Sequence, residues 1–261
     1  MADKSYKSYR QQLNILRSRG MVIGKGSQGS RVMRILEREN YYNVINGYKE
    51  LFLASKATAT ADEAYKTGTT FDEVYALYNF DRELRNIYLK YLLKLENTFK
   101  TVIAHEFSAK YGHDNYLKIE NFDNSTERNI SSSIKLIGDI QQEIARQMSK
   151  HHQVVTHYIT EHGYIPLWVL VNVLTFGKIE NFSVLGIVRA ADGSYTYGTN
   201  DAYAIAIMFA LLLSKSDLND FISSMRTAFG KLQKQLHTIS AADIMSIMGY
   251  DTNWTNLVNL I

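Results

Sequence analysis

TTFDEVYALYNFDRELRNIYLKYLLKLENTFKTVIAHEFSAKYG, residues 69–112, is the stretch that decides the fold. Apolar side chains recur from Phe71 to Phe107 in steps of three and four, which is the spacing of one face of an α-helix. Two threonines followed by two acids open the stretch, as is typical of a helix N-cap and first turn, and Gly112 suits the end. The pattern predicts a single helix over 71–111, about 60 Å long, as the central element of the fold.

Shorter helices are expected on both sides of this stretch. The chain has one proline, Pro166, which favours helices over an all-β fold rich in turns. The sequence predicts an all-α, multi-helix bundle with minor extended or hairpin segments. Helices are expected over 4–19, 28–39, 127–160 (as one or two), 166–177, 200–213, 218–236 and 241–248, with a turn and short helix over 40–52, a surface loop over 53–68 and a hairpin or turn over 192–198.

The expected domain boundary follows the same reading of the chain. It would divide a basic N-terminal helical segment, residues 1–68, from a helical domain over 69–261. One continuous domain over 1–261 is the alternative.

Composition excludes several classes of protein. Hydrophobic residues make up 46% of the 261 residues and charged residues 21%, which is typical of a folded globular chain. Cysteine is absent, which excludes disulfides, thiol nucleophiles and cysteine-ligated zinc. The sequence has neither a run of 18 uncharged apolar residues nor an apolar stretch behind a charged start. We therefore expect a cytoplasmic protein without a membrane partner, and we expect no cofactor.

Positive charge is concentrated at the start of the chain. Residues 1–40 hold nine bases and three acids, a net charge of +6, so the rest carries −3 of the total of +3. Tyrosines lie among these bases, and such a mixture suits RNA phosphates and unstacked bases; a solvated, solubilising face is the alternative. The candidate RNA-binding residues are Lys7, Arg10, Arg17, Arg19, Lys25, Arg31, Arg34, Arg38, Asn40, Tyr41, Tyr42 and Arg85.

For two further patterns we prefer a structural role to a functional one. GKGSQG, residues 24–29, matches the glycine pattern of dinucleotide-binding loops, but no second strand follows at the spacing of a βαβ unit. An interhelical loop is the better interpretation, although Lys25 could still touch phosphate. His151, His152, His157 and His162 lie close in sequence but lack the spacing of a zinc motif, so we expect no metal site.

A basic residue precedes a histidine by five positions at Lys100–His105 and at Arg146–His151. Such a pair can cleave RNA without metal, because imidazole moves a proton of the 2′-hydroxyl or of the leaving oxygen and the cation stabilises the charged phosphorus. The catalytic candidates are therefore Lys100, His105, Glu96, Arg146 and His151. The alternatives are an i,i+4 ion pair between Glu96 and Lys100, and cations placed at a helix C-terminus.

Several segments together resemble one protein family, in order along most of the chain. They are QQLNILRSRGM (11–21), ENYYNVINGY (39–48), TF (70–71), YNFDRELR (78–85), LENTFK (95–100), PLWVLVNVLTFG (166–177) and MGYDTNW (248–254). They are similar to motifs of the bacterial abortive-infection (Abi) family of AbiD/AbiF type. The resemblance implies phage defence and a helical fold related to the HEPN superfamily, whose active members are metal-independent ribonucleases with an Arg-(x4–6)-His motif.

The chain departs from this family in its expected catalytic motif. Relatives carry R-N-x-x-A-H after the helix that ends in TFG, whereas this chain has KIENFSVLGIVRAA between Gly177 and Asp192. Arg85-Asn86 and Arg128-Asn129 lack a histidine four to six positions on. We therefore expect weak or no catalysis, with Lys100 and His105 as a degenerate counterpart.

Three functions remain open at this point. The first is a phage-defence protein that binds RNA, such as a small non-coding RNA. The second is a metal-independent endoribonuclease or toxin that uses His105 or His151, with a site completed by the second subunit of a homodimer. The third is an interaction module that senses a phage protein as its trigger.

Overall fold

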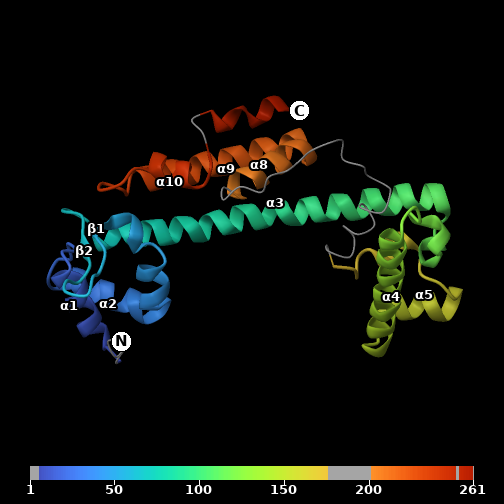
Figure 1. Cartoon of the computed structure of the whole chain (residues 1–261), viewed down its shortest axis with the longest axis horizontal. Coiled ribbons are helices and arrows are strands. Elements are labelled where there is room, and N and C mark those ends of the chain that lie inside the picture. The colour runs from blue at the N-terminus through green and yellow to red at the C-terminus, as the bar shows by residue number, and fades with distance from the viewer. Residues whose placement is uncertain (1–5, 176–200, 251–252, 261) are drawn as a thin grey trace. The chain divides into compact units, whose positions relative to one another are not determined.

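The structure is a computed structural model, and it describes residues 6–175, 201–250 and 253–260 (Figure 1). The described residues are mostly helical, with one two-stranded sheet, which confirms the mostly α class. The chain forms two compact units, Met1–Tyr91 with Tyr197–Ile261, and Leu92–Thr196. The domain boundary that we expect between residues 68 and 69 is not tested by this division into units, and it stays a prediction.

The long helix lies where the hydrophobic spacing predicts it. Helix α3 spans Phe71–Tyr111, 41 residues. Thr70 caps it, because its Oγ1 accepts a hydrogen bond from the Glu73 N–H at 3.2 Å. Gly112 follows with a φ of +89°, a left-handed conformation that glycine adopts without strain.

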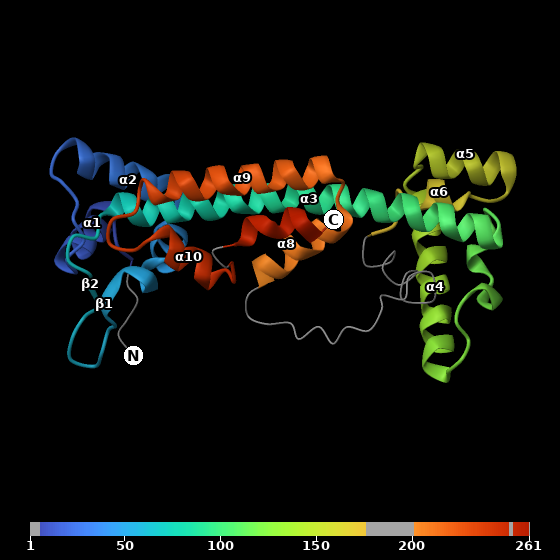
Figure 2. The same ribbon diagram turned by 90° about the horizontal axis from the view of Figure 1, so that it is seen from above.

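The first unit contains further helices besides the first part of α3. They are α1 (Tyr9–Ser18), α2 (Ser27–Glu39), α8 (Asp201–Leu212), α9 (Lys215–Gln233) and α10 (Ala241–Ile247), with short π or 3₁₀ turns at Tyr42–Asn46, Lys49–Phe52 and Trp254–Leu260. Both views show α9 alongside this part of α3 (Figures 1 and 2). Phe229 of α9 meets Phe80 of α3 at a ring-centroid distance of 5.1 Å, and Phe221 meets Tyr88 at 5.6 Å.

Two expectations for the first unit need correction. The expected helix over 4–19 begins at Tyr9, because Ser8 and Gln11 form a capping box that starts it there. The expected loop over 53–68 contains a small antiparallel sheet, β1 (Leu53–Ser55) with β2 (Ala64–Tyr65). Tyr65 is buried there, so this segment adds to the core.

A buried carboxylate joins the start of α3 to the segment between α9 and α10. Glu73 accepts backbone hydrogen bonds from Thr70 at 3.0 Å and from His237 and Thr238 at 2.6 Å each. Burial raises the pKa of the Glu73 carboxyl, but these hydrogen bonds outweigh burial and hold the pKa below its ordinary value. Glu73 therefore stays ionised in the folded chain.

The second unit has its own core, to which the last part of α3 contributes. It contains 3₁₀ turns at Asn115–Leu117 and Ile119–Asn121 and helices α4 (Glu127–Ser149), α5 (Gln153–His162) and α6 (Leu167–Leu170). Its core includes these almost completely buried side chains: Ile103, Phe107, Leu136, Ile140, Val155, Ile165, Leu167 and Leu170. The division of 127–160 into α4 and α5 fits the prediction of one or two helices.

Helix α6 is shorter than predicted. The Asn172 side chain donates to the carbonyl oxygens of Trp168 at 3.0 Å and Val169 at 3.2 Å, and it competes there with the backbone bonds of a continuing helix. The rest of the predicted helix from residue 176, and the predicted hairpin at 192–198, lie outside the described residues. In the part of the chain that the structure describes, no helix combines the length and apolarity that a bilayer crossing requires.

Candidate functional site

Three arginines form a stripe along one face of α2. Arg31, Arg34 and Arg38 are spaced by three and four residues, so their side chains emerge on the same side of the helix. All three are exposed, and with Tyr75 they line a hollow of about 310 Å³ whose lining contains no acid. We call Arg31, Arg34 and Arg38 the arginine stripe.

Acidic neighbours orient two of these arginines and leave the third unpaired. Arg31 forms an ion pair of 2.7 Å with Asp72, in which both side chains are about half exposed. Arg38 contacts Glu39 at 3.0 Å and donates a hydrogen bond of 3.3 Å to the Tyr75 hydroxyl. Among the described residues Arg34 has no ion-pair partner, so its full charge is available to a ligand.

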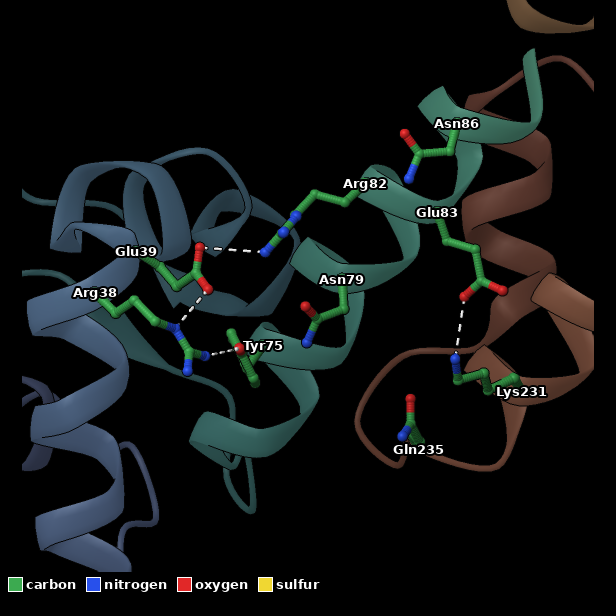
Figure 3. A pocket seen from close by; sticks show the side chains of 9 residues that line it. All are labelled: Arg38, Glu39, Tyr75, Asn79, Arg82, Glu83, Asn86, Lys231 and Gln235. Carbon is green, nitrogen blue, oxygen red and sulfur yellow. Dashed lines mark hydrogen bonds and ion pairs between the residues drawn. The ribbon is translucent and has the colours of Figure 1, made fainter. Parts of the chain in front are cut away.

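Glu39 lies between two arginines at a larger hollow of about 750 Å³ (Figure 3). It accepts hydrogen bonds from Arg82 at 3.2 Å and from the Tyr78 hydroxyl at 3.0 Å, besides its contact with Arg38. Burial raises the pKa of the Glu39 carboxyl, but these hydrogen bonds and the two nearby guanidinium charges lower it overall. Glu39 thus remains charged and fixes the directions of Arg38 and Arg82.

Polar side chains complete the lining of this larger hollow. Lys231 of α9 lies 3.2 Å from Glu83 of α3, and Figure 3 shows this pair across the hollow from Arg38. The amides that line it are those of Asn79, Asn86 and Gln235. Guanidinium, ammonium and amide groups are donors to phosphate oxygens and to base edges.

A third group of bases lies near the glycine-rich loop. Arg10, Arg17 and Lys25 line a hollow of about 290 Å³, and its lining contains no acid. Arg17 donates to the carbonyl oxygen of Gly24 at 2.7 Å, and the Gly24 N–H donates to Gln28 at 2.7 Å. The loop is therefore held by its own side chains. The described strands form one antiparallel pair, which is not the βαβ unit that a dinucleotide fold requires.

Two of the predicted RNA-binding cations form ion pairs within the first unit. Arg19 pairs with Asp62 at 3.0 Å and with Glu63, and its side chain is 21% exposed. Arg85 pairs with Asp81 at 2.6 Å, and Asp81 also accepts a hydrogen bond of 2.7 Å from the Tyr48 hydroxyl. Both guanidinium groups therefore have acidic partners in the folded chain, and neither needs a ligand to balance its charge.

The remaining predicted RNA-binding residues differ in their surroundings. Tyr42 is exposed and shares a hollow of about 400 Å³ with Arg85. Asn40 ends α2 with a φ of +69° and accepts a hydrogen bond from the Tyr42 N–H at 2.9 Å. Tyr41 is half-buried, and this burial raises the pKa of its hydroxyl. Lys7 is exposed ahead of α1.

In the second unit, Lys100 and His105 line one cavity of about 340 Å³. Lys100 is 14% exposed and pairs with Glu96 at 2.8 Å, the i,i+4 pair that the spacing predicts. The His105 ring is 77% exposed, and its Nδ1 lies 3.1 Å from Glu106. Trp168 and Asn172 line the same cavity from the segment that begins with α6.

Arg146 and His151 do not line this cavity. Arg146 forms an ion pair with Glu143 one turn earlier in α4. His151 follows α4, exposed, with a φ of +53°. Arg146 and His151 thus lie at the C-terminus of α4, where cations interact favourably with the helix dipole. This is the alternative to a catalytic role that the sequence offers for this pair.

Sequence reasoning did not select several residues that line these hollows. Asn97 and Thr101 precede His105 by eight and four residues, so helical spacing alone places them on its face of α3. Trp168 and Asn172 lie more than 60 residues away, and no local pattern brings them to this cavity. Tyr75 likewise lines the hollow of the arginine stripe only because α2 packs on α3.

Comparison with known proteins identifies a family that covers most of the chain. The family described as Abi-like protein matches residues 34–241. No curated protein and no solved structure matches the chain. The matched range includes Arg34 and Arg38 of the arginine stripe and the whole cavity of Lys100 and His105.

Proposed function

The chain belongs to the family of Abi-like proteins, and from this premise we propose that it is an abortive-infection phage-defence protein that acts by binding RNA. The observation that carries the proposal is the arginine stripe beside Tyr75. Three cations on one helix face match a row of phosphates, and the hollow that they line with Tyr75 has no acid in its lining that would repel those phosphates.

The surroundings of the stripe support the same interpretation. Tyr75 stacks between Phe71 and Tyr78, with ring centroids 6.0 and 5.9 Å away, so its ring is held in place before any ligand arrives. Arg38 is likewise held by Glu39 and Tyr75. A prearranged site loses less side-chain entropy on binding than a flexible one.

The test compares the RNA that co-purifies with the full chain and with two variants. Arg34→Glu reverses the charge that has no ion-pair partner among the described residues, and we expect it to remove most of the recovered RNA. Arg226→Glu on α9 is the matched control, since Arg226 is exposed and lines none of the hollows described above. Equal recovery from Arg34→Glu and from the unaltered chain would contradict the proposal.

The cavity of Lys100 and His105 favours a second candidate function, metal-independent cleavage of RNA. The exposed imidazole of His105 could take the proton of a ribose 2′-hydroxyl while that oxygen attacks the adjacent phosphorus and the 5′-oxygen leaves. Lys100 would stabilise the added negative charge on the phosphoryl oxygens. The leaving 5′-oxygen would take a proton from water, so the products would be a 2′,3′-cyclic phosphate and a 5′-hydroxyl end.

Cleavage assays in EDTA test this second candidate. We expect His105→Ala to abolish cleavage and His151→Ala to leave it unchanged, because the His151 ring lies outside the cavity. Intact RNA after prolonged incubation with concentrated protein would remove this candidate and leave RNA binding as the function.

A further inference from the structure

Five rings of the second unit touch one another in an unbroken row. Ring centroids lie 5.8 Å apart for His157 and His162, 6.3 Å for His162 and Tyr164, 5.1 Å for Tyr164 and His113, and 6.0 Å for His113 and Trp168. All five residues are exposed, and Trp168 is 52% exposed. We call these five residues the ring row.

The backbone beneath the ring row is fixed on the core. Gly163 ends α5 in a left-handed conformation, with a φ of +78°, and turns the chain toward Tyr164. Ile165, Pro166 and Leu167 are buried between the exposed Tyr164 and Trp168, so the core anchors the segment that joins these two rings. The Leu167 N–H donates to the His113 carbonyl oxygen at 2.9 Å, which ties α6 to the end of α3.

The row ends at the cavity that contains the candidate catalytic residues. Trp168, its last ring, lines the same cavity as Lys100 and His105. Acids flank the row elsewhere: Glu161 precedes His162 and Asp114 follows His113, and both are exposed. A ligand of the row would therefore be held through ring faces rather than through charge.

We propose that the ring row is a stacking platform for the bases of single-stranded RNA, with the strand directed along it toward the cavity of Lys100 and His105. This inference rests on the proposed function of RNA binding. Every base has a π face, so stacking on tyrosine, tryptophan and histidine rings tolerates any sequence. In a duplex those faces are already stacked, and the row therefore selects single strands.

Tryptophan fluorescence of the full chain tests the platform directly. The chain has two tryptophans, and Trp254 is 5% exposed, so quenching on binding reports on Trp168. The probes are an unstructured RNA oligonucleotide, its duplex, and an oligonucleotide of equal length whose bases are removed. We expect quenching by the first alone. Equal affinity for the normal and the base-free oligonucleotide would overturn the proposal.

A pair of variants separates the ring row from the arginine stripe. Trp168→Ala should weaken binding of the normal oligonucleotide about tenfold and leave the base-free one unchanged. Ile134→Ala on α4 is the control, because Ile134 is 57% exposed and lies outside the row. If Trp168→Ala kept its affinity for RNA while Arg34→Glu lost it, the proposed role of the ring row would be refuted and RNA binding by the arginine stripe would stand. Absence of RNA binding by the unaltered chain would refute the proposed function as well.

Discussion

Glu73 illustrates how one side chain stabilises the first unit through contacts distant in sequence. It is fully buried, and its carboxylate accepts hydrogen bonds from backbone groups 164 and 165 residues later. Hydrogen bonds to a charged group contribute about 1.5–3 kcal/mol each, and a buried donor left without its acceptor is costly. The negative charge of Glu73 therefore holds the α9–α10 segment against the start of α3.

We predict that Glu73→Gln lowers the free energy of unfolding by about 2 kcal/mol at neutral pH. The folded-state pKa of Glu73 is lowered, so its contribution is fully present above the ordinary carboxyl pKa of about 4.3 and is lost as the pH falls through the folded value. Urea unfolding at neutral and acid pH measures this difference.

The exposed Glu37→Gln is the control for that experiment, and we expect no change in its unfolding free energy. If Glu73→Gln unfolded at the same urea concentration as the unaltered chain at both pH values, the assigned role of Glu73 would be wrong.

Among elements, the small sheet depends on a network around Glu63. This carboxylate is 7% exposed and contacts Lys49 at 2.6 Å and Arg19 at 2.5 Å. Burial of Arg19 lowers the pKa of its guanidinium, but the hydrogen bond to Asp62 and the nearby acids raise it overall. Arg19 thus joins α1 to the segment before β2.

We predict that Arg19→Ala lowers the free energy of unfolding by about 2 kcal/mol, since it leaves Glu63 with one cationic partner. Arg34→Ala should change it by less than about 0.5 kcal/mol, because Arg34 is exposed on α2. Chemical denaturation of both variants measures the contrast. Equal stability of the two would show that Arg19 does not anchor the sheet.

How much of each element could be predicted depends on where its determinants lie. The bounds of α3 follow from hydrophobic spacing, its threonine cap and Gly112, all within the helix or next to it. The β1–β2 sheet could not be predicted because its strands have three and two residues, and because Arg19 lies over 40 residues before its partner Glu63.

The candidate sites show the same division. The ion pair of Lys100 and Glu96, and the shared face of Thr101 and His105, follow from helical spacing of four residues. Trp168 lines the cavity of Lys100 and His105, and Tyr75 lines the hollow of the arginine stripe. Both positions depend on tertiary packing, which no local pattern reveals.

In the whole molecule, the two units carry different chemistry. The arginine stripe belongs to the first unit, whereas the second unit contains six of the seven histidines and the ring row. Contacts to phosphate weaken as salt rises, while stacking contacts depend on it little. The two surfaces are thus expected to contribute to RNA binding in separable ways.

The dependence of RNA affinity on salt tests the central claim most directly. Affinity of the full chain should fall steeply between about 50 and 300 mM salt, because each phosphate contact with a single strand adds about 0.7 to the slope of log K against log salt. Replacing Arg31, Arg34 and Arg38 with alanine should reduce that slope by about 2, whereas Trp168→Ala should weaken binding at an unchanged slope. An affinity that does not depend on salt, or a slope unaltered by loss of all three arginines, would contradict the account.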